Sequence, residues 1–218
     1  DLHIGYEAAL EKQGIVMPTS QYPKIKAMVS KALKQTGAST LLINGDLKHE
    51  FGEATRQEWK ETLDFLDFLD RIGVRVIVVR GNHDNYLIPI LKKRGIELYD
   101  PSYQLQGYLF LHGHKELNLR SLAKDVKVII IGHEHPSIAV RDELGVKRKF
   151  KCFLKGEVWN RELIVLPALS PLASGSEVNT IPKEELLSPI LRASKMESMK
   201  AFVVEGDEVF EFPLELIS

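Results

Sequence analysis

The first half of the chain alternates short, uniformly apolar runs with longer segments in which apolar residues recur every three or four positions. The short runs suit buried strands, and the periodic segments suit helices packed on a sheet. Glycine follows the two longest periodic segments, at Gly37 and Gly73, and marks each helix end. The pattern predicts helices over Ser20 to Lys34, Glu53 to Ile72 and Leu87 to Lys93, and strands over Thr40 to Asn44 and Val74 to Val79. Such alternation predicts a largely parallel sheet with helices outside it.

After Gly95 the pattern changes to short strands separated by turn residues. Two separators, Asp142 to Gly145 and Glu205 to Glu208, contain the Gly and Asp residues that suit tight hairpins. The segment from Pro167 to Ser198 is richer in Ser, Pro and Gly, so we expect a long loop with a short helix over Lys183 to Ala193, over or beside the functional site. Strands are predicted at Ile96 to Tyr99, Tyr103 to Leu105, Tyr108 to Leu111, Val128 to Ile131, Ser137 to Arg141, Lys147 to Leu154, Leu163 to Leu166, Lys200 to Val204 and Val209 to Phe212.

Composition limits the class of protein. The chain has 218 residues, enough for a full core, and we expect a single domain over residues 1–218. Its 29 basic and 30 acidic residues nearly cancel, so no overall field favours a nucleic-acid or membrane partner. The single cysteine, Cys152, excludes an intrachain disulfide, and no secretory or long apolar segment is present. We therefore expect a cytoplasmic protein with no membrane partner.

Two local features add to this picture. The basic run from Lys147 to Lys151 is interpreted as the solvated face of an exposed strand, with a nucleic-acid contact as the alternative. The chain begins at Asp1 without Met, and no apolar run precedes its first polar motif. We expect that upstream residues, including a strand, are missing from this numbering or were removed, which leaves metal occupancy of this form open.

Polar residues gather where the apolar runs end. Histidines whose only role is to stabilise a core would also be scattered over helices and loops. The histidines of this chain are not scattered in that way. In α/β sheets, the strand ends are where ligands bind. All seven histidines lie in five places, of which the first opens the chain and the other four follow apolar runs: Asp1 to Gly5, Gly45 to His49, Gly81 to Asp84, His112 to His114 and Gly132 to His135.

These side chains have the chemistry of metal ligands. Carboxylate, imidazole and amide groups together suit borderline divalent ions such as Mn, Fe or Zn. Asp1 and His3 are two residues apart, so they share one face of an extended segment and can chelate one ion; the histidines of Gly132 to His135 have the same spacing. Together with Asp46 and Asn82, these two pairs of residues supply more ligands than one ion needs. The sequence therefore implies two metals, with Asp46 between them. Two-metal sites carry out in-line displacement at phosphorus.

The ordered motifs DLH, GDLKH, GNHD, LHGH and GHEH closely resemble those of the calcineurin-like metallophosphoesterases, whose pattern is D-x-H, G-D, G-N-H-D/E, H and G-H-x-H. They span residues 1–135. Downstream, HPSIAV and LPALSPLASG look like archaeal phosphoesterases related to SbcD and their bacterial ligase-associated relatives. The resemblance implies an α/β fold in which two facing mixed β-sheets, a β-sandwich, are flanked by helices.

The resemblance also implies a role for each polar residue. His83 would be the catalytic histidine, protonating the leaving alkoxide or stabilising phosphoryl charge, and Asp84 would orient its ring. His112 is preferred to His114 as a ligand because it directly follows its apolar run. His49 and His114 are assigned to the substrate side of the site, with a metal role as the alternative for His49. The implied metal ligands are Asp1, His3 and His135 for one ion, Asn82, His112 and His133 for the other, and Asp46 as the bridge.

The leading hypothesis is an enzyme with two divalent metal ions, manganese first and iron, zinc, nickel or magnesium as alternatives, that hydrolyses phosphodiesters through a metal-activated hydroxide. Kinship with SbcD and the basic strand favour DNA or RNA as the substrate. The near-neutral charge, and a length too short for the additional DNA-capping domain of SbcD, favour small nucleotides or phosphomonoesters instead. A non-catalytic scaffold on the same fold is a third interpretation, disfavoured because every ligand position and His83 are present.

Overall fold

The computed structural model describes residues 1–117 and 122–217. The chain forms two compact units. The N-terminal unit comprises Asp1–Pro101 and Leu169–Ala173, and the C-terminal unit comprises Ser102–Ala168 and Ser174–Ser218. That residues 1–218 make a single domain stays a prediction, and residues 118–121 and 218 lie outside the described part.

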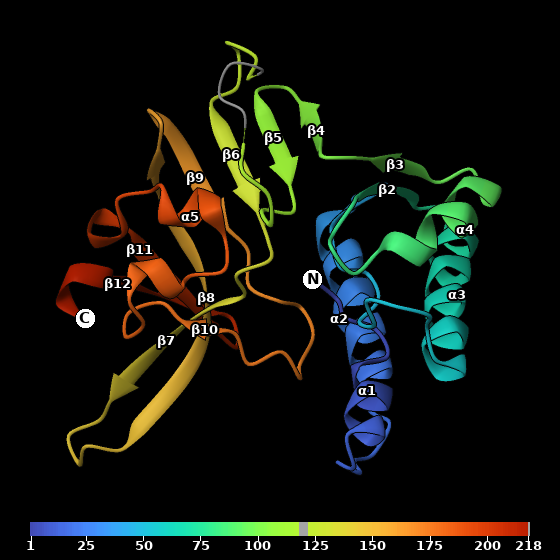
Figure 1. Ribbon diagram of the computed structural model, residues 1–218, viewed down its shortest axis with the longest axis horizontal. Helices are drawn as coiled ribbons and strands as arrows, with labels where there is room; N and C mark the ends of the chain where they lie inside the picture. Colours follow the sequence, from blue (N-terminus) through green and yellow to red (C-terminus); the bar gives the residue numbers. More distant parts are fainter. Residues whose placement is uncertain (118–121, 218) are drawn as a thin grey trace. The chain divides into compact units, whose positions relative to one another are not determined.

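The N-terminal unit alternates strands and helices, as its sequence predicts (Figure 1). Its strands form a three-stranded sheet in the order β1-β2-β3, and both pairings are parallel. Gly37 closes α2 in the left-handed conformation, as expected for a helix-ending glycine. The elements are α1 Tyr6–Lys12, α2 Gln21–Thr36, β1 Thr40–Asn44, α3 Arg56–Arg71, β2 Arg75–Val79, the 3-10 turn η1 Asn85–Leu87, α4 Ile88–Lys93 and β3 Glu97–Tyr99.

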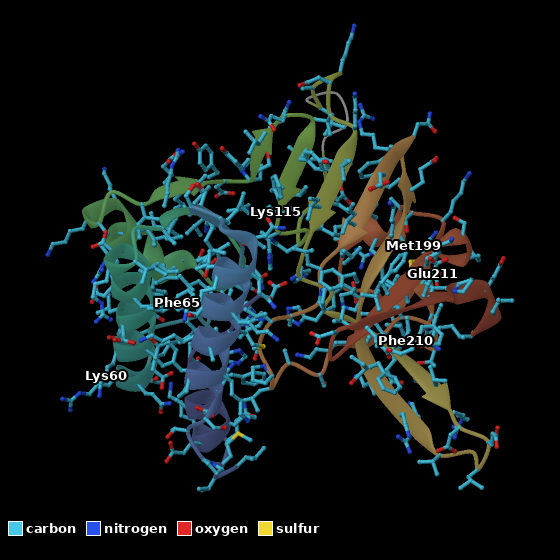
Figure 2. The ribbon with its side chains drawn as sticks, turned by 180° about the vertical axis from the view of Figure 1, so that it is seen from behind. Lys60, Phe65, Lys115, Met199, Phe210 and Glu211 are labelled. Atoms are coloured by element: carbon cyan, nitrogen blue, oxygen red, sulfur yellow. The ribbon has the colours of Figure 1, made fainter. Side chains whose placement is uncertain are left out.

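The apolar faces of α2 and α3 form one core with the sheet. Ile25 from α2 and Phe65 from α3 are completely buried with Val78 of β2. Figure 2 shows Phe65 on the inner side of α3, whereas Lys60 extends away from the unit. This one-sided burial is what the helical spacing of apolar residues predicts. The core fixes the helices against the sheet and leaves the strand ends to the polar motifs.

The C-terminal unit is built mainly of strands. They form a nine-stranded mixed sheet with the path β10-β7-β8-β9-β6-β5-β4, and β11 joins β8 and β12 beside it. The turns at Asp142 to Gly145 and Glu205 to Glu208 connect antiparallel pairs, so both predicted hairpins are confirmed. The strands are β4 Ser102–Leu105, β5 Tyr108–Leu111, β6 Val128–Ile131, β7 Pro136–Arg141, β8 Lys147–Val158, β9 Arg161–Val165, β10 Ser176–Glu177, β11 Lys200–Glu205 and β12 Glu208–Pro213.

The prediction of one helix over Lys183 to Ala193 is wrong. This segment contains instead the 3-10 turn η3 Lys183–Glu185 and the short helix α5 Pro189–Arg192. Ser188 caps α5 by accepting a hydrogen bond from the Leu191 N–H, and proline occupies its first turn. A proline disfavours helical backbone in the residue before it, so the helix restarts at this point. The short helices α1, η4 Met196–Ser198 and η5 Leu214–Leu216 were not predicted.

The α/β class, with mixed sheet structure and flanking helices, is confirmed. None of the helices within the described ranges has the length and apolar run that a membrane crossing requires.

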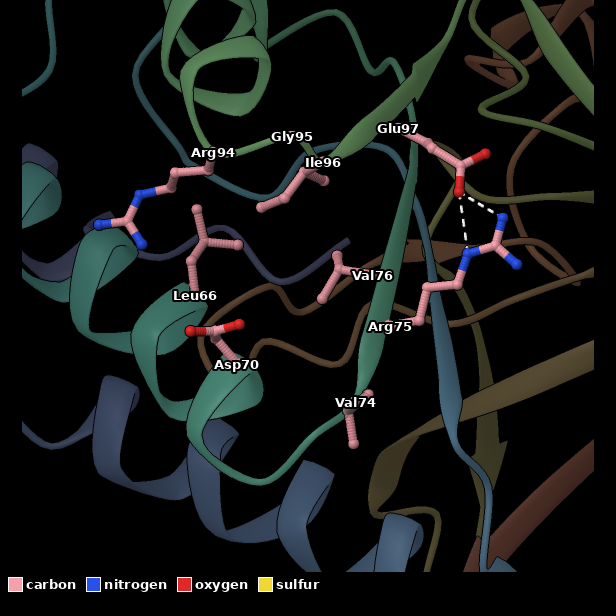
Figure 3. Close-up of a pocket in the computed structure, with 9 residues that line it drawn as sticks. All are labelled: Leu66, Asp70, Val74, Arg75, Val76, Arg94, Gly95, Ile96 and Glu97. Carbon is pink, nitrogen blue, oxygen red and sulfur yellow. Dashed lines mark hydrogen bonds and ion pairs between the residues drawn. The ribbon is translucent and has the colours of Figure 1, made fainter.

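A hollow of about 350 Å³ lies at the beginning of β2, between α3 and β3 (Figure 3). Three of its charged groups have partners, since Arg75 pairs with Glu97 and Arg94 pairs with Asp67. The polar motifs follow the other ends of the strands. The hollow is therefore not the functional site.

The N-cap of α3 gives a test of the fold. Thr55 Oγ1 accepts a hydrogen bond of 3.1 Å from the Glu58 N–H, which would otherwise be unpaired within the helix. We expect Thr55→Ala to lower the free energy of unfolding by about 1 kcal/mol, measured by urea denaturation. Thr55→Ser keeps the hydroxyl and should unfold near the wild-type midpoint. Equal losses in both variants would contradict this role.

Candidate functional site

The ends of β1 and β2 bring Asp46 and the Gly81 to Asp84 loop together. The two strands pair in parallel with Asn44 opposite Val79, so the residues that follow them leave the same edge of the sheet. Gly81 packs directly on Asp46, where an added Cβ would lie 2.1 Å from Asp46 Oδ1. The His83 N–H then donates a hydrogen bond of 3.0 Å to that same oxygen. The backbone of one motif thus holds the carboxylate of another.

The N-terminal segment adds His3 to this carboxylate. Ile4 forms a parallel bridge with Lys48, and the N–H groups of Leu2 and His3 both donate to the Asp46 carbonyl at 3.0 Å. His3 Nε2 lies 3.8 Å from Asp46 Oδ2, and His83 Nε2 lies 3.7 Å from the same oxygen. Two other motifs, separated from it in sequence, therefore converge on Asp46.

This geometry fits a divalent metal ion. Atoms that each lie about 2.1 Å from one ion can be at most about 4.2 Å apart, and the His3 to Asp46 distance of 3.8 Å is within that limit. His3, His49 and His83 each offer a ring nitrogen, and these atoms lie within 4.8 Å of one another. Nitrogen and carboxylate oxygen donors suit borderline divalent ions. The N-terminal unit thus has the donor set for a metal.

The remaining predicted ligands of this unit lie in the same region. The carbonyl of Asp1 accepts hydrogen bonds from the Leu169 N–H and the Ser170 N–H, so the segment at 169–173 holds the start of the chain. Asn82 is half-buried between Gly81 and His83 in the loop that packs on Asp46.

His83 has a defined environment within the N-terminal unit. Its Nδ1 contacts the His49 carbonyl, and its ring stacks on Phe51 with centroids 3.6 Å apart. Asp84 is completely buried, and its carboxylate accepts hydrogen bonds from the Leu47 N–H and the Gly81 N–H at 3.0 and 2.9 Å. Asp84 thus fixes the loop backbone. That Asp84 orients the His83 ring stays a prediction. In the structure, the group that contacts His83 Nδ1 is the His49 carbonyl.

His49 is placed by a buried glutamate. Glu58 Oε1 accepts hydrogen bonds from the His49 N–H at 2.7 Å and the Glu50 N–H at 2.8 Å. Burial raises the pKa of Glu58, while these N–H groups oppose that shift. The His49 ring stacks on Tyr6 at 3.9 Å, and its Nδ1 lies 3.4 Å from His3 Nδ1. Burial, followed by the neighbouring His83, lowers the pKa of His49 to about 4, so its neutral imidazole is favoured at neutral pH.

Three further histidines gather in the C-terminal unit. β5 and β6 pair in parallel with Leu111 opposite Ile131, and the Gly132 N–H donates to the His112 carbonyl. The ring of His112 lies 4.9 Å from that of His133 and 5.1 Å from that of His114, between centroids. His112 is buried and His114 is half-buried. The histidines that follow the two strands therefore meet at one edge of the sheet.

A second buried carboxylate supports these histidines. Glu134 is completely buried, and its Oε2 accepts a hydrogen bond of 2.9 Å from the Ser188 N–H. The Ser188 hydroxyl in turn donates to the Gly113 carbonyl at 2.8 Å. Burial is the main cause that raises the pKa of Glu134. Glu134 and Ser188 thus tie the turn that carries His133 and His135 to the loop that carries His112 and His114.

Four of the predicted ligands have unusual backbone conformations. His3, Asp46, His133 and His135 have φ values of +48°, +45°, +65° and +50°. The other non-glycine residues with positive φ in the described ranges, Gln106, Trp159 and Asn160, lie in two-residue hairpin turns, where this conformation is expected. The four ligands have no such turn to require it. Strain of this kind is concentrated at functional sites.

Sequence reasoning found the polar motifs but missed the residues that support them. Glu58 had a signal, because Thr55 and Glu58 have capping-box spacing, although its carboxylate turns to the loop of His49. Gln21 is almost fully buried and donates from Nε2 to the His3 carbonyl at 2.9 Å and to Ser170 Oγ at 2.6 Å. A glutamine at a helix start gives no sequence signal for this role.

An α/β fold that gathers aspartate and histidine at strand ends has the features of a metal-dependent hydrolase. The family model for calcineurin-like phosphoesterases matches residues 1–137, well over half of the chain. The chain therefore belongs to the calcineurin-like phosphoesterase family, and the expected family is confirmed. Its class is that of metal-dependent phosphoric ester hydrolases.

Solved structures of the same superfamily resemble the chain. The nuclease MPE of Pseudomonas putida matches with a TM-score of 0.59 and 19% identity over 86% of this chain and 78% of that one, which supports the fold. The phosphoesterase YfcE of E. coli has 20% identity over 89% of this chain and 88% of that one, but its TM-score of 0.40 is too low to add to the comparison. No curated protein sequence matches significantly.

The contact between Gly81 and Asp46 gives a test of the site. Gly81→Ala places a methyl group against the Asp46 carboxylate and its backbone N, so the two loops must separate. We expect manganese affinity, measured by titration calorimetry, to fall by about tenfold or more. Gly52→Ala is the matched control, because an added Cβ there meets nothing within 4 Å. Wild-type affinity in Gly81→Ala would rule out this packing as a requirement of the site.

Proposed function

We propose that this chain is a phosphodiesterase that uses two divalent metal ions and acts on nucleic acid. The observation that carries the proposal is the convergence of His3 Nε2 and His83 Nε2 on one oxygen of Asp46, at 3.8 and 3.7 Å. A carboxylate flanked by imidazoles from two other motifs is the arrangement that a metal-dependent phosphoesterase needs. The family membership of residues 1–137 supports the same reaction.

Seven side chains would hold the metals. Asp46 would be shared between the two ions, since its carboxylate has two oxygens and lies between motifs. When bound, such ions lower the pKa of water toward neutrality and stabilise charge on phosphoryl oxygens. Asp1, His3 and His135 would hold one ion, and Asn82, His112 and His133 the other.

His83 would supply the proton for the leaving group. Its Nδ1 faces the His49 carbonyl, an acceptor, which favours a proton on Nδ1 and directs Nε2 toward Asp46. In the protonated ring Nε2 also carries a hydrogen, which it can give to the departing alkoxide as the P–O bond breaks. The stacked ring of Phe51 restricts the rotation of His83. His49 and His114 lie beside the proposed ligands and would contact the substrate.

A nucleic-acid substrate in the manner of SbcD-like nucleases is supported by the basic run on β8 and by the fold shared with the Pseudomonas putida nuclease. Manganese is the proposed resident metal, and the cytoplasm the proposed location. Small nucleotides and phosphomonoesters are the second candidate, because the net charge of −1 gives no general attraction for polyanions. A non-catalytic scaffold on this fold is disfavoured by the presence of every proposed ligand and of His83.

Asp46→Asn tests the shared ligand. The amide removes the negative charge but keeps an oxygen for the His83 N–H, so the loop should stay folded. We expect loss of manganese binding in calorimetry and loss of turnover of bis(p-nitrophenyl) phosphate. Normal hydrolysis of this aryl diester by the variant would show that the assignment of Asp46 is wrong.

His83→Ala tests the proton donor. We expect the variant to keep its manganese content, measured by elemental analysis, while kcat falls by about 10²- to 10⁴-fold. Phe51→Leu is the comparison variant, because it loosens the packing of His83 but keeps its imidazole, so its kcat should fall much less than that of His83→Ala. A His83→Ala variant that loses its metal would instead make His83 a ligand.

The substrate class can be identified by measuring turnover of a panel of phosphomonoesters, cyclic nucleotides, single-stranded and duplex DNA, and RNA, each with Mn, Mg and Zn. Binding of nucleic acid should weaken steeply as salt rises, whereas turnover of a small phosphoester should change little. Turnover of monoesters alone would favour the second candidate.

A further inference from the structure

The basic run on β8 lies on one face of the strand. Side chains alternate between the two faces of a strand, so Lys147, Lys149 and Lys151 share a face, about 6.8 Å apart along the strand. The alternate residues Cys152 and Leu154 belong to the core on the opposite face. Lys147 and Lys149 are exposed and Lys151 is half-buried. The sequence therefore forms a single row of cations.

The neighbouring strand connects this row to the metal-ligand turn. β7 pairs with β8 so that Arg141 lies opposite Lys147, and Ser137 opposite Lys151. Ser137 is only two residues after His135, so the row runs outward from the turn that carries His133 and His135. Arg141 adds a fourth cation at the outer end.

Lys149 provides a second link between the row of cations and the metal-ligand turn. Its Nζ donates a hydrogen bond of 2.6 Å to the Gly175 carbonyl. Gly175 in turn packs on the backbone of His135, where an added Cβ would lie 1.9 Å from the His135 carbonyl oxygen. The ammonium group is thus held near the metal-ligand turn rather than at a remote part of the surface.

The outer end of the row opens into a hollow of about 600 Å³. Arg141 and Lys147 line it together with the polar side chains of Asn179 and Thr180, and Leu216 and Ile217 supply an apolar side. A space of this kind, with cations on one side and apolar side chains on the other, can receive both the phosphate and the base of a nucleotide.

The acidic residue that faces the row is Glu177. Its carboxylate pairs with Lys147 at 2.6 Å and with Lys149 at 3.8 Å, and Lys147 lowers the pKa of Glu177. Pairs between exposed side chains are weak, so a phosphate can compete with this carboxylate. Glu177 thus pairs with two of the four cations in the row, whereas the next two cations on this face, Lys155 and Lys200, pair with the separate carboxylates of Glu162 and Glu211.

An exposed aromatic ring follows the row. Phe153 is the next residue on the same face after Lys151, and its exposed fraction is 38%. In the antiparallel pair of β8 and β11 it lies opposite Phe202. Bases without partners stack on such rings, whereas the bases of a duplex are already stacked on each other. A single file of cations also matches one phosphate backbone rather than two.

We propose that the face of the β7–β8 hairpin formed by Arg141, Lys147, Lys149 and Lys151 binds the backbone of single-stranded nucleic acid and guides it to the turn of His133 and His135. This inference rests on the proposed function and names its substrate as single-stranded DNA or RNA. Glu177 acts as the competitor that a bound phosphate displaces.

The test is binding of a fluorescent oligonucleotide of about 12 nucleotides, as DNA and as RNA, by anisotropy in EDTA so that no turnover occurs. In the double variant Lys147→Gln and Lys149→Gln we expect affinity to fall by about tenfold or more at low salt, and the slope of log affinity against log salt to fall by about 1.4. Glu177→Gln should bind more tightly than wild type. Hydrolysis of bis(p-nitrophenyl) phosphate should be unchanged in all of these variants.

Arg148→Gln is the matched control, because Arg148 lies on the same strand but on the other face and pairs with Asp142. It should bind the oligonucleotide like wild type. The inference is overturned if the double variant binds within twofold of this control, if the wild type binds no oligonucleotide, or if duplex DNA binds as tightly as single strands. If the wild type hydrolyses bis(p-nitrophenyl) phosphate in any of those cases, the proposed function stands and only this inference fails. If the wild type does not hydrolyse this diester, the proposed function is refuted separately.

Discussion

The close approach of Gly81 to Asp46 is the constraint on which the N-terminal half of the site depends. Parallel pairing of β1 and β2 brings the two strand ends to one edge, but only a residue without a Cβ lets the second loop pass over the carboxylate. The His83 N–H then bonds that carboxylate and fixes its direction. The position of the catalytic candidate and that of the shared ligand are therefore set by one backbone contact.

Buried carboxylates that are not proposed ligands organise both units. Asp84 and Glu58 in the N-terminal unit, and Glu134 in the C-terminal unit, are completely buried and accept hydrogen bonds from backbone N–H groups. Burying a carboxylate is costly unless such donors compensate for the lost water. Each of these bonds ties a segment that carries a polar motif to another part of the same unit. The cost of burial is thus offset at the places where loop positions must be fixed.

The sequence predicted the elements that have a strong local signal. The strand over Thr40 to Asn44 has the bounds expected for it, and the helix ending at Gly37 is confirmed. The helix over Lys183 to Ala193 failed because Ser188 and Pro189 start a new helix, a signal that the apolar spacing conceals. The motifs that carry Asp46, His83 and His112 were found because they end apolar runs. The roles of Gln21 and Glu134 could not be found, because they depend on contacts with segments far along the chain.

The left-handed backbone at His3, Asp46, His133 and His135 has a consequence for how such a site can change over evolutionary time. Among residues with a side chain, Asn, Asp and His tolerate this conformation best, whereas β-branched residues are strongly disfavoured. Exchanges among the tolerated types leave a group that can still coordinate a cation. Drift toward an apolar surface would lose folding stability together with the ligand, so the shape of the chain itself selects for the chemistry at these four positions.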